Sequence, residues 1–231
     1  MKKWILALVL AVGTVGLAAC GDDEPAEDTQ PETETSEPVK LTDEEKMDEE
    51  EVVAVVNGTE LTGNKYNPLY LQVKMLNQQF GQGDNEPETV KEQTMIILIE
   101  QELIRQDAEE QNIEVADQEA EDELKALIAE VGEEDYESVL EENEMTEEEF
   151  KKQIKDDLIT QKYMDEQFDT DVSKEEIQKN YDTLKEENEE LGELEDVEDQ
   201  IRELVAQEKE TEQLQERLEE LKEKAEIEEL I

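Results

Sequence analysis

The sequence predicts a mainly α-helical domain, with a small N-terminal β-hairpin paired to the C-terminal tail and a long C-terminal helix. Three observations predict this class. A β-branched run at residues 52–56 is followed by Asn57-Gly58, the dipeptide that best supports a tight hairpin turn. After Thr62, apolar residues recur at helical spacing. The last residues, AEIEELI, return to apolar-polar-apolar alternation, which indicates a strand.

Residues 1–19 have the pattern of a secretory signal peptide. Lys2 and Lys3 precede an uncharged apolar stretch, and small residues lead to Cys20. The stretch is shorter than the roughly 20 residues that a membrane-spanning helix needs. The ending LAAC matches the lipobox of bacterial lipoproteins, in which the cysteine thiol receives a diacylglyceryl group and becomes the mature N-terminus. The alternative is a plain signal peptide, but Cys20 is the single cysteine of the chain and stands where the lipobox needs it.

Residues 20–51 are predicted to form an acidic, disordered tether. Pro25, Pro31 and Pro38 stand among Asp, Glu, Thr and Ser, and no apolar period appears before the valines. Like charges along such a segment repel one another and extend it. We therefore expect the folded domain to occupy residues 52–231, lifted off the membrane by this segment.

Two helices are expected after the hairpin. Asn67 and Pro68 fit the cap and first turn of the first helix, which ends near Phe80. The second begins near Pro87. Its run MIILIEQELI, residues 95–104, is dense enough in apolar residues to form the buried centre of the domain.

Capping signals mark the start of three further helices, with a short piece around Tyr136 between the first and second of them. Asp117 can cap the first of these, and capping boxes that begin at Thr146 and Ser173 start the other two.

Beyond Gly192 the apolar spacing predicts one long amphipathic helix over about residues 194–225, whose centre, residues 207–213, is polar. The segment around Ile227, after this helix, is the sole later candidate to pair with residues 52–56, and the side chain of Ile227 is expected to be buried there. A lone hairpin is marginal in water, so the two ends of the domain are expected to close on each other.

The charge of the chain excludes some partners. The chain has 71 acidic and 21 basic side chains among 231 residues, a formal net charge of −50. A nucleic-acid partner is excluded, since phosphate-binding surfaces need clustered Lys and Arg, and electrostatic docking on anionic membranes is disfavoured. Salt screens the internal repulsion. We therefore interpret the acidity as adaptation to a saline or alkaline exterior, with functional cation binding as the alternative.

Residue types exclude several kinds of catalytic and metal site. With no histidine and one cysteine, the chain can assemble neither a Ser–His nor a Cys–His nucleophilic pair, nor a metal site built on cysteines. No segment has the spacing of an EF-hand. Ser173-Lys174 is better explained as a helix start than as a catalytic pair. We expect no catalytic residue, no metal site and no cofactor.

The order of these segments resembles the N-terminal chaperone domain of SurA-type and PrsA-type extracytoplasmic foldases. The resemblance covers residues 52–231. It rests on the entry VVAVVNGTELT, the helix MIILIEQELIRQDAEEQNIEV, the pattern EMTEEEFKKQIKDDLITQKYMDEQF, the exit DVSKEEIQKNYDTLKEE and the terminal helix DVEDQIRELVAQEKETEQLQERLEELKEKAEIE. In that family the last segment of the chain covers the first strand, as expected here from the hairpin.

The chain departs from the family at one place. The family inserts a parvulin-type prolyl isomerase domain, whose site is built around histidines, before the terminal helix. Here only residues 185–194 stand at that place, and the sequence has no histidine. The resemblance therefore implies a chaperone that acts without ATP and without isomerase activity.

The resemblance implies binding of unfolded secreted or envelope polypeptides, by a protein anchored in the membrane through Cys20. Apolar client segments would lie in a shallow groove between helices. Since Met and aromatic side chains suit promiscuous surfaces, the candidate client-binding residues are Tyr66, Tyr70, Met75, Phe80, Tyr163, Met164 and Phe168. Ordinary core packing is the alternative for each of them.

The competing function is structural: an acidic envelope lipoprotein that assembles through its long C-terminal helix, as coiled coils do. An exposed apolar groove favours the chaperone, and a continuous exposed apolar seam on the terminal helix favours assembly.

Replacing Cys20 with Ala is expected to release the protein from the membrane fraction. Each buried CH₂ of a lipid contributes about 0.8 kcal/mol, and two chains on one residue are enough for stable anchoring. Cell fractionation with immunoblotting measures the distribution, with Ser36→Ala as a control in the same segment. A Cys20→Ala protein that stays with the membranes contradicts the lipobox interpretation.

Overall fold

The structure is a computed structural model that describes residues 39–80, 86–142, 145–188 and 190–231. These residues belong to the second of the two units into which the chain divides, Pro38–Ile231. The predicted signal peptide, Cys20 and the predicted tether up to residue 38 lie outside the described residues.

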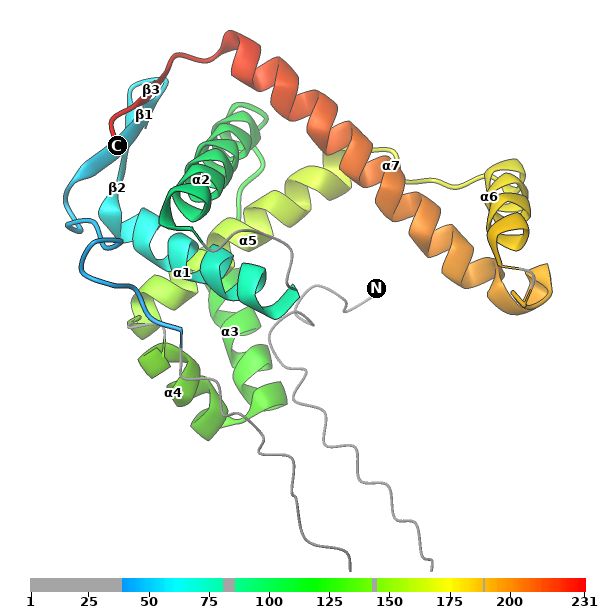
Figure 1. The fold of residues 1–231 in the computed structure, drawn as a ribbon, viewed down its shortest axis with the longest axis horizontal. Helices are drawn as coiled ribbons and strands as arrows, with labels where there is room; N and C mark the ends of the chain where they lie inside the picture. Colours follow the sequence, from blue (N-terminus) through cyan, green and yellow to red (C-terminus); the bar gives the residue numbers. More distant parts are fainter. Residues whose placement is uncertain (1–38, 81–85, 143–144, 189) are drawn as a thin grey trace, which may run out of the picture. The chain divides into compact units, whose positions relative to one another are not determined.

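Helices dominate the described residues, and three short strands form one sheet (Figure 1). None of these helices is both long and apolar enough to cross a membrane. In chain order the elements are β1 (Val52–Val56), β2 (Thr59–Thr62), α1 (Gly63–Phe80), α2 (Pro87–Glu110), α3 (Asp117–Val131), α4 (Glu133–Glu142), α5 (Glu147–Gln167), α6 (Lys174–Glu187), α7 (Leu194–Lys224) and β3 (Ile227–Glu229).

The predicted fold class is confirmed by the sheet, whose strand order is β2-β1-β3. Asn57 and Gly58 have positive φ angles of 52° and 83°, as a tight hairpin turn requires. β1 pairs antiparallel with β2 on one edge and with β3 on the other. The C-terminal tail therefore completes the sheet that the N-terminal hairpin begins.

Backbone hydrogen bonds, rather than side-chain burial, hold the C-terminal strand. The amide of Asn57 donates to the carbonyl of Glu226 at 2.8 Å, and the amide of Leu230 donates to the carbonyl of Val53 at 2.9 Å. Ile227, which the sequence suggests as the buried residue of the tail, is 36% exposed. Its burial contributes less than expected because β3 lies at the edge of the sheet, where helices do not cover it fully.

Helix α1 begins earlier than the sequence predicts. The amides of Gly63 and Asn64 donate to the carbonyls of Glu51 and Glu49 at 2.9 and 3.1 Å, so the preceding segment caps the helix. Pro68 lies inside the helix, near its start, and removes one helical hydrogen bond. Asn67 is not the cap: its side-chain amide accepts from the backbone N–H of Met47 and donates to its carbonyl, both at 2.9 Å.

The part of the predicted tether that the structure describes, residues 39–51, packs on α1. Glu45 is buried, and its carboxylate lies 2.8 Å from the Nζ atom of Lys74. Gly63 permits the contact, since a Cβ atom there would lie 2.1 Å from the carbonyl oxygen of Asp48. The folded part of the chain therefore begins before residue 52, because these interactions fix the acidic segment.

The capping boxes at Thr146 and Ser173 are confirmed. Each side chain accepts a hydrogen bond from the backbone N–H of a glutamate three residues later, at 3.3 Å. Asp117 is the first residue of α3 rather than its cap, which is Ala116. The carboxylate of Glu119 accepts from the amide of Ala116 at 3.0 Å and satisfies that end of the helix instead.

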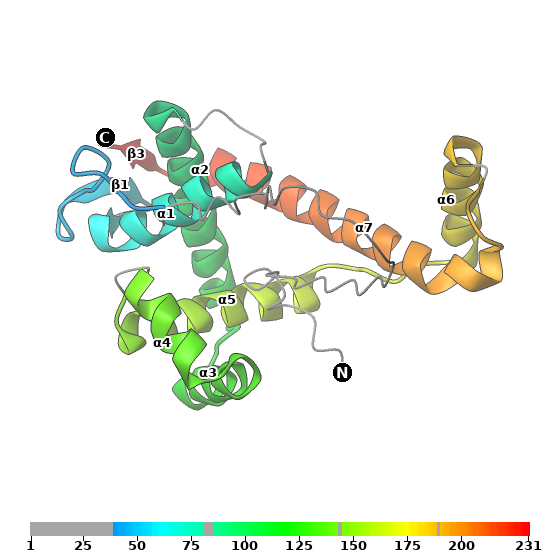
Figure 2. The same ribbon diagram turned by 60° about the horizontal axis from the view of Figure 1, so that its bottom comes forward.

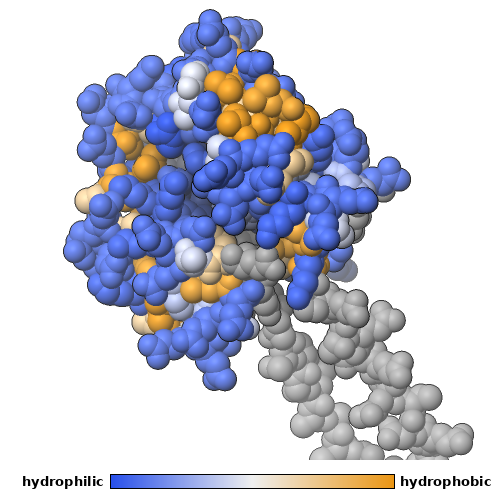
Figure 3. Space-filling view, turned by 90° about the vertical axis from the view of Figure 1, so that its left-hand side faces the viewer, coloured by the Kyte–Doolittle hydropathy of each residue, from blue (hydrophilic) through white to orange (hydrophobic). Residues whose placement is uncertain are grey.

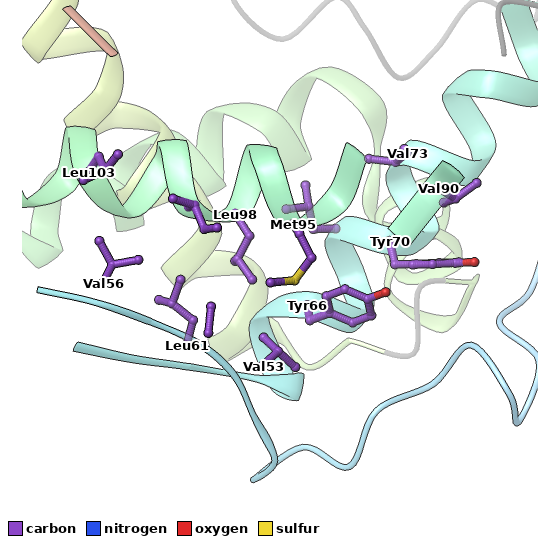
Figure 4. Packing of buried hydrophobic residues seen from close by; sticks show 13 residues of the cluster. Val53, Val56, Leu61, Tyr66, Tyr70, Val73, Val90, Met95, Leu98 and Leu103 are labelled. Carbon is purple, nitrogen blue, oxygen red and sulfur yellow. The ribbon is translucent and has the colours of Figure 1, made fainter. Parts of the chain in front are cut away.

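One buried cluster joins the sheet to the helices, and a smaller one joins α7 to the body of the domain. Figure 4 shows the larger one, in which side chains of the hairpin, α1 and α2 point toward one another. The smaller one holds the C-terminal half of α7 against α2 and α5, through Tyr163 and the leucines 214, 218 and 221. The N-terminal half of α7 packs on α6 instead, around Ile177, Ile201 and Val205 (Figure 2). The long helix thus links two separate apolar cores.

Deleting residues 225–231 is expected to lower hydrogen-exchange protection in residues 52–56 and 95–104 together. β1 would lose the backbone bonds of β3, worth roughly 0.5–1.5 kcal/mol each. The cluster that contains Met95 and Leu98 would also lose Ala225 and Ile231. Ile227→Ser keeps the backbone bonds and should change protection far less. Unchanged protection in both segments after the deletion would mean that the tail is a free end.

Candidate functional site

A pocket of about 430 Å³ lies between residues 40–49, α1, α2 and α5. Its apolar lining comes from three buried leucines, Leu69, Leu71 and Leu98, with Leu41 and Pro68 beside them. The pocket lies between helices, where the sequence predicts a groove, but most of its lining residues are polar or charged. Residues 40–49, which the sequence places in the tether, form one wall.

The rim of the pocket carries charges of both signs, in contrast to the rest of the acidic chain. The basic lining residues are Lys40, Lys46, Lys65, Arg105 and Lys152, and the acidic ones are Asp43, Glu49, Glu102, Glu149, Asp156 and Asp157. The number of cations nearly equals that of carboxylates here, whereas the whole chain has 21 against 71. The pocket is therefore a place where a polypeptide meets little net repulsion.

A buried carboxylate, that of Glu102, connects the pocket to the hairpin. Arg105 donates to both of its oxygens, at 2.6 and 2.9 Å, and Gln106 donates at 2.7 Å. Burial by itself would raise the pKa of Glu102, but these bonds and the charges of Arg105 and Lys65 hold it below its usual value. Gln106 also donates to the carbonyl of Val56. The pocket wall and the turn of the sheet are thus one hydrogen-bonded unit.

Three of the seven predicted client-binding residues are core residues. Tyr66, Tyr70 and Tyr163 are 1%, 1% and 0% exposed. Each ring packs in one of the apolar clusters described above, and the rings of Tyr66 and Tyr70 are 5.6 Å apart. The prediction that they line a groove is wrong because an aromatic residue on a helix face fills a core as well as a surface.

The other four predicted residues differ in exposure. Met164 and Phe168 are partly buried and pack in the cluster that holds α7. The structure does not describe the side chain of Phe80. Met75 is 42% exposed and Leu76 beside it 44%. They lie one helical turn beyond Leu71 and Gln72 of the pocket, on the same side of α1. Of the predicted set, Met75 is the one that is clearly exposed, one helical turn from the pocket along α1.

The leucines of the pocket could not be separated from core residues by sequence alone. One signal was present: Leu41 and Met47 are isolated apolar residues within an acidic segment, and both pack against the main cluster. Apolar atoms also reach the surface elsewhere. Figure 3 shows separate hydrophobic areas on a mostly hydrophilic face, the one that carries the sheet. Ile227 and Leu230 are exposed in the tail.

A buried ion pair fixes α7 to the body of the domain. Arg217 of α7 donates to both carboxylate oxygens of Asp107 in α2, at 2.7 and 3.0 Å, and the hydroxyl of Tyr163 in α5 donates to the same carboxylate. Burial alone would raise the pKa of Asp107, but the bonds from Arg217 and Tyr163 lower it. Three helices therefore meet at one carboxylate.

Within the described ranges, no group of three or more His, Cys, Asp or Glu side chains is arranged to hold a metal ion. The chemistry that the pocket offers is apolar contact, hydrogen bonding and ion pairing.

The chain matches a known family. Residues 2–164 match the family model described as the SurA-like N-terminal domain. Over 149 residues the chain is 32% identical to the foldase protein PrsA of Caldanaerobacter subterraneus subsp. tengcongensis. The aligned region covers 59% of this chain and 44% of that protein. The chain thus spans less than half the length of this curated relative.

A solved structure shares the fold. It comes from work on PEB4 and Cj1289, two structurally related SurA-like chaperones of Campylobacter jejuni. The superposition has a TM-score of 0.51, covers 78% of this chain and 98% of that chain, and has 13% sequence identity. At this identity the likeness concerns the fold.

Replacing Arg217 with Met is expected to destabilise the domain at neutral pH by roughly 1.5–3 kcal/mol, the contribution of hydrogen bonds to a charged group. Asp107 would then be buried without a cation. The double variant Asp107→Asn/Arg217→Met should recover part of the loss because no ionised carboxylate remains.

The destabilisation should also depend on pH. Because the folded-state pKa of Asp107 is lowered, the contribution of its carboxylate to stability is present at neutral pH and lost as the pH falls below about 4. The deficit of Arg217→Met should shrink there.

Urea denaturation at several pH values measures these differences. Arg202→Met is the control, since Arg202 pairs with Glu198 and both side chains are 41% exposed. Its loss should stay within about 1 kcal/mol. Equal stability of Arg217→Met and wild type at pH 7 would refute a joining role for this ion pair.

Proposed function

We propose that this chain, which belongs to the family of SurA-like N-terminal domains, is an extracytoplasmic chaperone that holds unfolded secreted polypeptides. It works without ATP, without a cofactor and without prolyl isomerase activity, and it is anchored in the membrane by a lipid on Cys20. The observation that carries the proposal is the pocket with its leucines, together with two exposed apolar side chains, Met75 and Leu76, one helical turn further along α1.

Two relatives support this proposal by their names. One is a foldase and the other belongs to a pair of SurA-like chaperones, one of them periplasmic. A rim with charges of both signs around apolar side chains suits polypeptides of varied sequence, because it strongly repels neither acidic nor basic segments. Exposed apolar side chains next to such a pocket add contact area for an unfolded segment.

The proposal excludes isomerase activity for a topological reason. The family resemblance places the isomerase domain before the terminal helix, and residues 188–193 alone join α6 to α7. This connection has the length of a loop. The activity proposed for the chain is therefore binding.

The proposed anchor limits how far the domain reaches from the membrane. Residues 39–51 are fixed to α1, so residues 20–38 alone remain between the lipid and the described structure. A fully extended chain of this length spans at most roughly 65 Å. Clients would be held within that distance of the membrane.

The alternative, assembly through α7, needs a continuous apolar seam on that helix. Among the large apolar side chains of α7 in the described ranges, Leu204 is the one that is clearly exposed, at 39%. The others pack on α6 or on the body of the domain. We therefore favour the chaperone over the structural lipoprotein.

Suppression of aggregation tests the proposal. A reduced, acidic secreted protein is diluted into high salt with increasing amounts of the full chain, and light scattering is followed without ATP. An acidic client is used so that attraction to a chain of net charge −50 cannot explain binding. Wild type should suppress scattering, and absence of suppression would refute the proposal.

The variant Met75→Ser/Leu76→Ser should need roughly tenfold more protein for half suppression. Each of these side chains is partly exposed and offers about 1 kcal/mol of apolar contact, and 1.4 kcal/mol is a factor of ten. Leu204→Ser removes one comparably exposed apolar side chain, from α7, and should suppress scattering as wild type does. An equal effect of both variants would place the binding surface outside the pocket.

A further inference from the structure

The charges of α5 are divided between two faces of the helix. Its lysines 151, 155 and 162 pair with carboxylates of α3, those of Glu121, Asp117 and Glu119, at 2.5, 2.5 and 2.7 Å. These lysines share one side of α5 by their spacing. The basic residues on this face thus serve to hold α3 and are not available to neutralise the opposite face.

The opposite face of α5 lines the pocket and carries two adjacent carboxylates. Within the described residues, neither Asp156 nor Asp157 makes an ion pair or a side-chain hydrogen bond. Burial raises the pKa of Asp156, although Lys65, Lys152 and Arg105 partly offset this. Asp157 is exposed, and the pKa of its carboxyl is raised, first by the surrounding protein and then by the charge of Asp156. The positive charges near Asp156 act on it without direct contact, so both carboxylates are free to accept an ion pair.

The basic residues around the pocket do not supply that partner. Lys65 and Arg105 face the carboxylate of Glu102, at 3.5 and 2.6 Å. Lys152 lies one turn before Asp156 on the same helix, and no ion pair joins them in the described structure. An arriving cation would therefore find two carboxylates beside an apolar floor, with no competing ion pair to break.

We propose that the pocket recognises client segments in which a large apolar side chain is followed by lysine or arginine. The apolar side chain would lie on the floor formed by Leu69, Leu71 and Leu98, and the cation would pair with Asp156 and Asp157. A volume of about 430 Å³ has room for side chains of an extended segment and not for a folded partner. This inference rests on the proposed chaperone function and adds the class of segment that the site selects.

Two labelled peptides test the inference at high salt, by fluorescence anisotropy with the full chain. Both are short, acetylated and amidated. One has Leu-Leu-Lys-Leu at its centre and the other has norleucine in place of lysine. Wild type should bind the lysine peptide about tenfold more tightly than the norleucine peptide, because only lysine can form charge-assisted hydrogen bonds with the two carboxylates. In Asp156→Asn/Asp157→Asn this preference should disappear, while binding of the norleucine peptide is unchanged.

Glu208→Gln/Glu212→Gln is the matched control, because it removes two exposed carboxylates from α7 with the same change in net charge. It should keep the full preference for lysine. Equal loss of preference in both double variants would show general attraction to an acidic protein and overturn the inference.

The melting temperature of Asp156→Asn/Asp157→Asn should not fall, since no partner is lost, so a change in peptide binding is not a folding defect. If wild type binds both peptides equally and still suppresses aggregation, the inference fails and the proposed function stands. If wild type binds neither peptide and suppresses no aggregation, both fail.

Discussion

The structure depends on the return of the chain to its first strand. β1 is the central strand of the sheet, and its second edge is covered by residues that follow the last helix. Helix α7 therefore has to run from α6 back to the hairpin, and the ion pair between Arg217 and Asp107 fixes it on the way. An apolar strand with one open edge would be a template for aggregation. Pairing with β3 covers this edge of the apolar strand and leaves a short strand with two glutamates at the border of the sheet instead.

Basic residues stand mainly at the joints between elements, which explains how so acidic a chain stays folded. Lys74 joins the N-terminal segment to α1, the lysines of α5 hold α3, and Lys222 pairs with Glu100 at 2.7 Å to hold α7 to α2. Exposed ion pairs contribute little individually. Ion pairs between elements that are distant in the sequence contribute more stability, because they are partly buried. They also place the few basic residues between acidic helices, where repulsion between carboxylates would otherwise be strongest.

The segment before β1 combines two properties that bear on function. It forms one wall of the pocket, and it is also the part of the described structure that lies nearest in sequence to Cys20. Its docking on α1 uses a buried carboxylate, that of Glu45, whose pKa stays low despite burial because Lys74 and Thr42 donate to it. The proposed client site would therefore lie on the part of the described structure that is nearest in sequence to the proposed anchor.

The sequence alone determined the features that short-range physics specifies. The Asn57-Gly58 turn, the capping boxes at Thr146 and Ser173, and the extent of α7 follow from local turn and capping chemistry and from apolar spacing. The pairing of the tail with β1 could be inferred by elimination, since the sequence after Thr62 contains no other strand signal. Tertiary structure alone decided that Tyr66, Tyr70 and Tyr163 are core and that residues 39–51 dock on α1 and shift its start. It also decided that Asp156 and Asp157 remain unpaired beside a pocket. These outcomes depend on which residues that are distant in the sequence come into contact, and a periodic pattern does not specify those contacts. An aromatic residue on a helix face gives the same pattern whether its neighbour is solvent or another helix.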